Sequence, residues 1–575
     1  MAAEPQLDAA GSPKGRVIRF LAAVLILCSP VFPQSPAARQ KAAQRALDAG
    51  DWAEAATLAR GPADQSPELD FLAGLALARL EKWSESKLAF EAGFEKAPRD
   101  PRFLVELAGL AYQQKDFRTA KQRLEKALGL NPHDAYSCEF LATIYFLEGN
   151  LEAALKYWNA EDQPRLRSVA FTPSVRLAPS LRNRALAFNA PQVLSGDALL
   201  ATQSRLDHLG VFANQRVELH PGESGNYDLT LHLAERNGWG HSKVEGLVSL
   251  LSGLPYFTVY PEFYNLAHQA VNLTSLARWD PEKRRASLAL ALPLFGDPRL
   301  RLRLYTDARN ENWNLTETFL GAGTPLADLN MRRAAMGVEA HALVNARWSW
   351  SAGAEIANRN FRNLSGHTSP AERTFFTGAT SVAAWLGVQR TLVRVPERRF
   401  TLDSSAEAKA GREFSQELGP FATLRGSLRA HWFPRAQGDD YEMQAQIRAG
   451  ATAGHATLDE LFELGIERDN DLWLRGHAGT LDGRKGAAPL GRRFFLANWE
   501  VDKTIYQNGF LRVTFGPFLD NGAAADSSGL FGSSRWLWDT GVQSKVRVLG
   551  NLTIVLCYGR DLGGGRNVFY GTVLR

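Results

Sequence analysis

The sequence predicts a multidomain chain of three folded parts: an all-α helical solenoid, a small α+β domain and a C-terminal transmembrane antiparallel β-barrel. Three observations predict this order: a repeat of 34 residues, then one capped helix followed by two strand-like runs, then alternating apolar and polar residues to the end. We expect the three parts at residues 38–165, 166–237 and 238–575. A length of 575 residues is consistent with more than one domain.

Composition and charge exclude two classes of protein. The net charge of +5, from 66 basic and 61 acidic residues, is too small to indicate a nucleic-acid partner. Apart from the start of the chain, no apolar run has the length of a transmembrane helix, which excludes a polytopic helical membrane protein. A β-barrel is still allowed, because its strands need only alternating apolar residues.

The start of the chain has the layout of a secretory signal peptide. An apolar run over residues 20–32 follows Arg16 and Arg19 and precedes the small residues that end at Ala37. We therefore expect residues 1–37 to be a signal peptide and the protein to be exported.

Small and large side chains recur in register at 34-residue spacing, the period of tetratricopeptide (TPR) helix pairs. Small residues at two columns would let paired helices approach closely, and large residues at a third would fill the space between pairs. These columns are Gly74, Ala108 and Ala142; Ser86, Ala120 and Ala154; and Phe90, Leu124 and Trp158. The resemblance to TPR arrays implies that these repeats bind a protein or peptide. The alternative is that the repeats are a spacer without a ligand.

The pattern of the middle part, residues 166–237, predicts one helix followed by a hairpin. Ser195 is a suitable N-cap and Gly210 a suitable end for a helix, and strand-like runs follow at 215–220 and 227–234. An edge strand here would offer unpaired backbone groups to an extended client chain, so we expect client binding along this strand. The residues expected to do so are Gln215, Val217 and Leu219. The alternative is a linker domain that only braces the barrel.

The last part shows alternation and no convincing helix pattern. Residues 287–292, 299–304 and 551–556 alternate most clearly. A spanning strand needs roughly 9 to 11 residues, so this part has room for about sixteen strands.

Two short motifs place an arginine and an aspartate in this region. The first is Leu474-Arg475-Gly476-His477, within a loop-like stretch at 467–493, and the second contains Phe518, Asp520 and Gly522. The alternation at 510–516, continued in steps of two, puts Asp520 on the polar face that would line a barrel lumen. We expect Arg475 to reach Asp520 from inside and to pin the loop. Asp469-Asn470-Asp471 lacks the rest of a calcium loop and is expected to be solvated.

These motifs resemble those of the BamA-like family of outer-membrane assembly and secretion proteins, the bacterial surface antigen family. That family carries an Arg-Gly motif on a loop inside the barrel and a Phe-x-Asp-x-Gly motif on a nearby strand, although it has an aromatic residue where His477 stands. The strings at 209–212, 217–219, 227–229 and 235–236 likewise resemble the family's polypeptide-transport-associated (POTRA) domain.

The resemblance implies an insertase or a polypeptide-translocating pore of sixteen strands in the bacterial outer membrane, with the N-terminal domains in the periplasm. Its implied partners are unfolded or secreted client polypeptides, outer-membrane lipids and an accessory protein on the TPR surface. Two rivals stay open, a polysaccharide export porin and a structural tether of the envelope.

No catalytic or nucleotide-binding motif is present in the sequence, so we expect no enzyme and no cofactor. The eleven histidines have no metal-ligand spacing, and Cys138 and Cys557 fall in different parts, so neither a metal site nor a disulfide is expected.

Overall fold

The computed structural model describes residues 35–575, except 61–65, 237, 242, 317–324, 367–371, 416–418, 510, 527–530, 534, 549–551 and 575. The predicted signal peptide at 1–37 lies almost wholly outside the described residues. The chain forms two compact units, residues 1–144 and 145–575. None of the described helices combines the length and the apolar character needed to cross a membrane.

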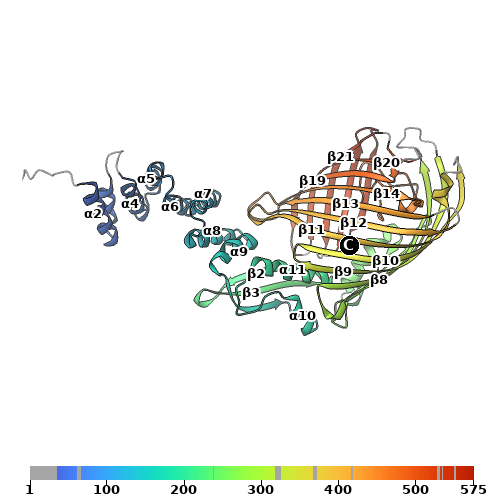
Figure 1. Cartoon of the computed structure of the whole chain (residues 1–575), viewed down its shortest axis with the longest axis horizontal. Helices are drawn as coiled ribbons and strands as arrows, with labels where there is room; N and C mark the ends of the chain where they lie inside the picture. The colour runs from blue at the N-terminus through green and yellow to red at the C-terminus, as the bar shows by residue number, and fades with distance from the viewer. Residues whose placement is uncertain are drawn as a thin grey trace, which may run out of the picture. The chain divides into compact units, whose positions relative to one another are not determined.

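Unit 1 is a succession of helices (Figure 1). They are α2 (Pro36–Asp48), α3 (Trp52–Ala59), α4 (Pro67–Arg79), α5 (Trp83–Lys96), α6 (Pro101–Gln113), α7 (Phe117–Leu130) and α8 (Ala135–Leu147), whose last residues enter unit 2. Helices α4, α6 and α8 begin at positions 67, 101 and 135, so the 34-residue spacing of the sequence is also the spacing of the helices. Close packing explains the small residues: a Cβ on Gly74 would lie 2.5 Å from the ring of Phe90, which is fully buried.

Unit 2 begins with α9 (Leu151–Trp158) and a small α+β region. Its elements are β1 (Arg165–Thr172), α10 (Pro179–Ala185), α11 (Gly196–Leu209), β2 (Phe212–Pro221) and β3 (Asn226–Glu235). The predicted helix and both predicted strands are confirmed: Ser195 caps α11 and Gly210 ends it with φ of 67°. β3 lies between a parallel β1 and an antiparallel β2, so β2 is an edge strand of this sheet.

The prediction that no helix follows Gly238 is wrong. The chain continues with α12 (Gly238–His241) and α13 (Lys243–Gly253), and η3 (Leu254–Tyr256) leads into β4 (Thr258–Val259) and β5 (Glu262–Leu266). Leu247, Leu251 and Leu254 recur at helical spacing, a pattern that a search for two-residue alternation does not detect. All three side chains are exposed.

A large antiparallel sheet forms the rest of unit 2 and curves round on itself (Figure 1). After β4 and β5, which both pair with β6, each long strand pairs with the next, and β14 pairs with β19. The two ends of the sheet meet where the Tyr256 hydroxyl donates to the Gly571 carbonyl oxygen at 2.8 Å. The long strands are β6 (Val271–Trp279), β7 (Lys283–Pro293), β8 (Leu300–Thr316), β9 (Pro325–Asn345), β10 (Trp348–Gly366), β11 (Thr380–Val395), β12 (Phe400–Phe414), β13 (Pro420–Trp432), β14 (Tyr441–Gly454), β19 (Arg493–Gln507), β20 (Leu511–Ala525), β21 (Leu537–Val548), β22 (Leu552–Asp561) and β23 (Asn567–Leu574).

The region predicted as a barrel, residues 238–575, begins with α12 and α13, and the predicted number of about sixteen strands stays a prediction.

The strands are joined by short connections at one rim of the sheet and by longer connections at the opposite rim. At the end near α9 and α10 the turns are short, as between β9 and β10 and between β21 and β22. Two contacts identify this end: Arg394 Nη2 donates to Glu152 Oε2 of α9 at 2.6 Å, and Arg184 Nη1 of α10 donates to the Phe295 carbonyl at 2.9 Å. The opposite end carries the longer connections, including residues 455–492 between β14 and β19.

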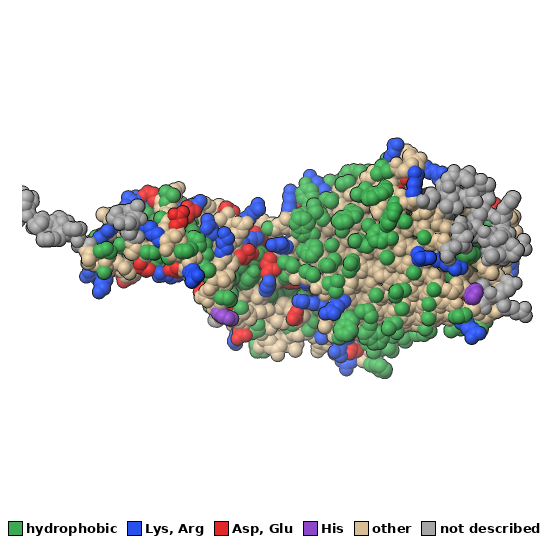
Figure 2. Space-filling model, turned by 45° about the horizontal axis from the view of Figure 1, so that its top comes forward, with side chains coloured by type: hydrophobic (Ala, Val, Ile, Leu, Met, Phe, Trp, Pro, Cys, Tyr) green, Lys and Arg blue, Asp and Glu red, His purple; other side chains and the backbone are tan. Residues whose placement is uncertain are grey.

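The two faces of the sheet differ in polarity. On β20, Phe515 and Leu519 are 45% and 38% exposed on the outer face, whereas Asp520 on the inner face is fully buried. Figure 2 shows hydrophobic side chains gathered over the outer surface of the sheet, with few charges among them. An apolar outside and a polar inside are the polarity of a barrel surrounded by lipid.

Candidate functional site

The connection between β14 and β19, residues 455–492, lies against the inner face of the sheet and is called the inner loop below. It contains η8 (Leu458–Glu460), β15 (Phe462–Glu463), β16 (Thr480–Leu481), β17 (Arg484–Lys485) and β18 (Leu490–Gly491). An apolar cluster fixes it to the wall; its members are Phe462, Leu464, Leu472 and Leu474 of the loop and Phe494, Leu496, Ala524 and Leu537 of the strands. Leu474, the first residue of the predicted loop motif, is fully buried there.

The structure brings Arg475 and Asp520 together. Arg475 Nε donates to Asp520 Oδ2 at 2.9 Å and Nη2 donates to Oδ1 at 2.7 Å, which is the bidentate geometry that suits a guanidinium and a carboxylate. The Arg475 side chain is 4% exposed and that of Asp520 is 0% exposed. The Phe518 ring lies under the guanidinium at 4.0 Å, so two of the three residues of the strand motif, Phe518 and Asp520, contact Arg475.

Two partners of Arg475 were not predicted. Its Nη1 donates to Glu500 Oε2 at 2.9 Å and to Gln543 Oε1 at 2.7 Å. Glu500 also accepts from Lys545 Nζ at 2.6 Å, and Lys545 donates as well to Asp502 at 2.7 Å. Both partners lie on inner-face positions of β19 and β21, and only the strand register could have identified them.

The glycines of both motifs lie at close approaches, Gly476 between the loop and the wall and Gly522 between strands β19 and β20 of the wall. A Cβ on Gly476 would lie 2.6 Å from Asp539 Cγ and 2.7 Å from the backbone nitrogen of Asp561. A Cβ on Gly522 would lie 3.0 Å from the Phe495 carbonyl oxygen. Backbone contact at Gly476 therefore leaves no room for a side chain, which explains why glycine follows the arginine.

A second cluster of ion pairs joins the inner loop to β6, β7 and β8. Asp469 accepts from Arg278 Nη1 and from Arg285 Nη1, both at 2.7 Å, and its side chain is 4% exposed. Lys485 of the loop lies 3.2 Å from Glu311 of β8. The prediction that the Asp469-Asn470-Asp471 stretch is solvated is therefore wrong for Asp469, because paired arginines from two strands bury it.

A third cluster joins the start of the loop to β10 and β12. Arg359, whose side chain is 1% exposed, donates from Nε to Asp459 at 2.7 Å and from Nη2 to Glu460 at 2.6 Å. Lys409 of β12 donates to Glu460 at 2.7 Å. The loop thus binds β6–β8, β10–β12 and β19–β21, which are distant stretches of the sheet, and so it crosses the interior.

A cavity of about 720 Å³ lies between the inner face of the sheet and α11. Its lining includes Asp471 and Leu472 of the inner loop, together with strand residues that are mostly polar. The arginines among them are Arg301, Arg347, Arg390, Arg425, Arg429 and Arg448. A lining of this kind favours water over lipid inside the sheet.

The predicted client-binding residues lie on the edge strand β2, and client binding by them stays a prediction. Leu219 is 5% exposed, and Gln215 Nε2 donates to the Gln203 carbonyl of α11 at 3.1 Å. Val217 shares this face of the strand, because side chains two residues apart point the same way. These three side chains face the domain's own helix, so an added strand would meet the backbone of β2.

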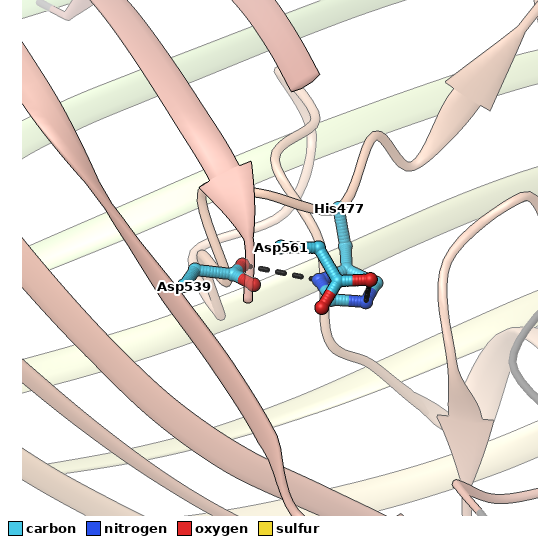
Figure 3. Close-up of side chains that lie close together, drawn as sticks. All are labelled: His477, Asp539 and Asp561. Atoms are coloured by element: carbon cyan, nitrogen blue, oxygen red, sulfur yellow. Dashed lines mark hydrogen bonds and ion pairs between the residues drawn. The ribbon is translucent and has the colours of Figure 1, made fainter. Parts of the chain in front are cut away.

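One group in the described residues has the composition of a metal site: His477, Asp539 and Asp561, each offering a ligand atom within 4.8 Å of the others. Figure 3 shows the imidazole and the two carboxylates turned toward one another. They come from the inner loop, β21 and β22, so sequence spacing could not have indicated them.

Comparison with solved structures finds similar folds at low identity. BamA from Haemophilus ducreyi lacking POTRA domains 1–3 is 12% identical with a TM-score of 0.40, covering 71% of this chain and 84% of that one. CdiB from Acinetobacter baumannii is 12% identical with a TM-score of 0.41, covering 74% and 81%. CdiB from Escherichia coli is 12% identical with a TM-score of 0.44, covering 72% and 75%. No family model and no curated protein matches the chain.

Proposed function

We propose that this protein is an outer-membrane insertase or polypeptide-translocating pore without enzymatic activity. The observation that carries the proposal is the buried, bidentate pair of Arg475 and Asp520, made by a loop that crosses the interior of the sheet. The two motifs that resemble those of BamA-like proteins contain these same residues. We further propose that the sheet closes into a transmembrane barrel and that the inner loop regulates its interior.

The polarity of the sheet supports a location in a membrane. Its outer face is apolar and its connections are short at one end and long at the other, which is the asymmetry of outer-membrane barrels. In such barrels the short turns face the periplasm. The α+β region contacts the short-turn end through Arg184 and Phe295, so we place it in the periplasm.

The edge strand β2 supports recognition of extended polypeptides by a POTRA-like domain. Its side chains at Gln215 and Leu219 contact or are buried in the domain itself, which leaves the backbone as the group that a client strand would pair with. Backbone pairing depends little on client sequence, and this property suits a receptor for many unfolded chains. The helical repeats would recruit clients or an accessory protein, with a spacer as the alternative.

The two rival functions make different demands on the inner loop. A passive polysaccharide porin needs an open path, whereas here the loop is held to three regions of the wall by buried ion pairs. A structural tether needs neither the loop nor the Arg475 contact. The insertase and the translocation pore both need a loop that can be held and released.

The test is assembly of an unfolded β-barrel client into liposomes that contain the purified full-length protein. We expect wild type to accelerate assembly and Arg475→Ala to lose most of this effect while its own barrel stays folded. Arg484→Ala is the matched control, because this loop arginine is 42% exposed and pairs with Glu282 at the surface. If wild type accelerates neither client assembly nor client passage into the lumen, the proposal is wrong, and oligosaccharide efflux would favour the porin.

A further inference from the structure

Three aspartates stand side by side across the inner face of the sheet. Asp520 of β20 is the direct neighbour of Asp539 of β21, and Asp539 is the direct neighbour of Asp561 of β22. Their residues are 0%, 0% and 5% exposed. Like charges directly opposite one another destabilise a sheet, and burial increases the cost. Each carboxylate therefore needs a compensating positive charge or several hydrogen bonds.

Asp520 obtains that charge from Arg475, whereas no arginine or lysine in the described part of the chain forms an ion pair with Asp539 or Asp561. Among the described residues, the basic side chain within 4 Å of Asp539 and Asp561 is His477, at 3.0 Å from Asp539 and 3.7 Å from Asp561. Asp561 also accepts backbone hydrogen bonds from Gly563 and Gly564 at 2.8 and 2.9 Å. Two ionised carboxylates carry two negative charges, which one divalent cation would balance.

A second observation points to a ligand at this place. Asp539 is fully buried, and its Oδ2 accepts from the Gly476 backbone and from His477 Nδ1, whereas its Oδ1 has no hydrogen-bond partner in the described structure. A buried carboxylate oxygen without a partner is costly unless something else satisfies it. Figure 3 shows the Asp539 carboxylate turned toward the His477 imidazole.

We propose that His477, Asp539 and Asp561 bind one divalent transition-metal ion, of which Zn²⁺ is the representative probe. One imidazole nitrogen and two carboxylates form a three-residue set that suits zinc and similar ions, with a fourth position left for water. Imidazole is a poor ligand for calcium and magnesium, which take oxygen ligands. Ligands about 2.1 Å from a tetrahedral ion are about 3.4 Å apart, so the observed separations need only small side-chain movements.

The ion would connect the tip of the inner loop to two strands of the wall. His477 belongs to the loop, whereas Asp539 and Asp561 belong to β21 and β22. Bound metal would therefore hold the loop in the position seen here, in addition to the contacts of Arg475. This inference stands on the site alone and does not depend on the proposed function.

The test is Zn²⁺ titration of the metal-stripped, full-length protein in detergent, by calorimetry and by elemental analysis after gel filtration. We expect one ion per chain in wild type, and an affinity lower by at least about tenfold in His477→Gln and in Asp539→Asn, since loss of even an outer-shell partner has that effect. His455→Gln is the control, because His455 is exposed at the start of the same loop. It should bind Zn²⁺ as wild type does.

A second measurement covers the case in which Asp539→Asn does not fold. Co²⁺ bound to wild type should show the visible absorption of a low-coordinate site, and His477→Gln, whose side chain is 14% exposed in wild type, should lose it while the barrel stays folded. The proposal is overturned if wild type binds no stoichiometric Zn²⁺. It is equally overturned if His477→Gln binds as tightly as His455→Gln.

Discussion

Removing the Arg475 guanidinium should release the tip of the inner loop. Four side-chain hydrogen bonds to three partners are lost in Arg475→Ala. Glu500 keeps Lys545 at 2.6 Å, so the charge left without its cation is Asp520, which is fully buried and keeps Asn498 at 2.7 Å. Breaking a buried pair by removing one partner costs about 3 to 5 kcal/mol. Because Asn498 still donates to Asp520, we take the lower value, about 3 kcal/mol, as the loss of stability of the bound loop. This loss corresponds to about a 100-fold larger population of molecules with the inner loop released.

Cys557 is a native reporter of this release. It is 1% exposed on the inner face of β22 and packs against Ile466 of the inner loop. The backbone of Arg475 rests on the same strand, since a Cβ on Gly559 would lie 2.1 Å from the Arg475 carbonyl oxygen. Cys138 is the other cysteine outside the predicted signal peptide, and with it replaced by alanine, maleimide labelling at low reagent concentration measures how often the inner loop opens near Arg475.

We expect labelling of Cys557 to be about 100-fold faster in Arg475→Ala and nearly unchanged in Arg484→Ala, whose exposed ion pairs contribute less than about 1 kcal/mol. Heat-modifiable migration on gels would show that both variants keep a folded barrel. Equal labelling rates in the two folded variants would refute the reasoning, because the Arg475 contacts would then not hold the loop.

Three further predictions concern other parts of the chain. Gly74→Ala would place a methyl group against Phe90 and should lower the unfolding free energy by about 1 to 3 kcal/mol. Gly109→Ala, where a Cβ meets nothing within 4 Å, should raise the unfolding free energy by about 0.5 to 1 kcal/mol. Urea unfolding followed by circular dichroism at 222 nm measures both changes, and equal effects would contradict the packing argument. Burial lowers the pKa of His208 in α11 from 6.5 to about 4, so between these pH values the unfolded chain binds a proton that the folded chain does not. The stability of α11 should therefore decrease as the pH falls from 6.5 to about 4. Hydrogen exchange corrected for pH should show this loss of stability, and the same loss in His208→Gln would rule out this histidine as its cause. Leu386→Lys on the apolar outer face should destabilise the barrel by about 2 to 4 kcal/mol in liposomes relative to Leu386→Met, and equal stability would argue against lipid contact there.

Local signals in the sequence were sufficient for much of the fold. Ser195 and Gly210 mark the ends of α11 because a capping hydroxyl and a left-handed residue act within one turn of a helix. The 34-residue period locates α4, α6 and α8 for a similar reason, since each repeat contacts only its neighbours. The helix α13 was missed because its leucines are read only at a period of 3.6 residues.

The site could be predicted only in part, because most of its partners are set by strand register. Arg475 and Asp520 belong to short motifs, whereas Glu500, Asp539 and Asp561 are single acidic residues in unrelated strands. Their proximity follows from which residue faces which across β19 to β22, and a shift of one residue would turn each to the other face. No local pattern in the sequence carries that information.

The chemistry of the inner loop is suited to a contact that must be both specific and reversible. Its three attachments to the wall depend on ion pairs through Asp459, Asp469 and Arg475. Buried ion pairs add little net stability, because desolvation offsets their attraction, but they require one geometry. When such a loop leaves the wall, water in a polar lumen rehydrates the separated charges, so release is far less costly than separation within a dry core. Apolar packing alone would hold the loop without this selectivity, and we therefore expect the charged residues, more than the apolar cluster around Leu474, to set where the loop rests.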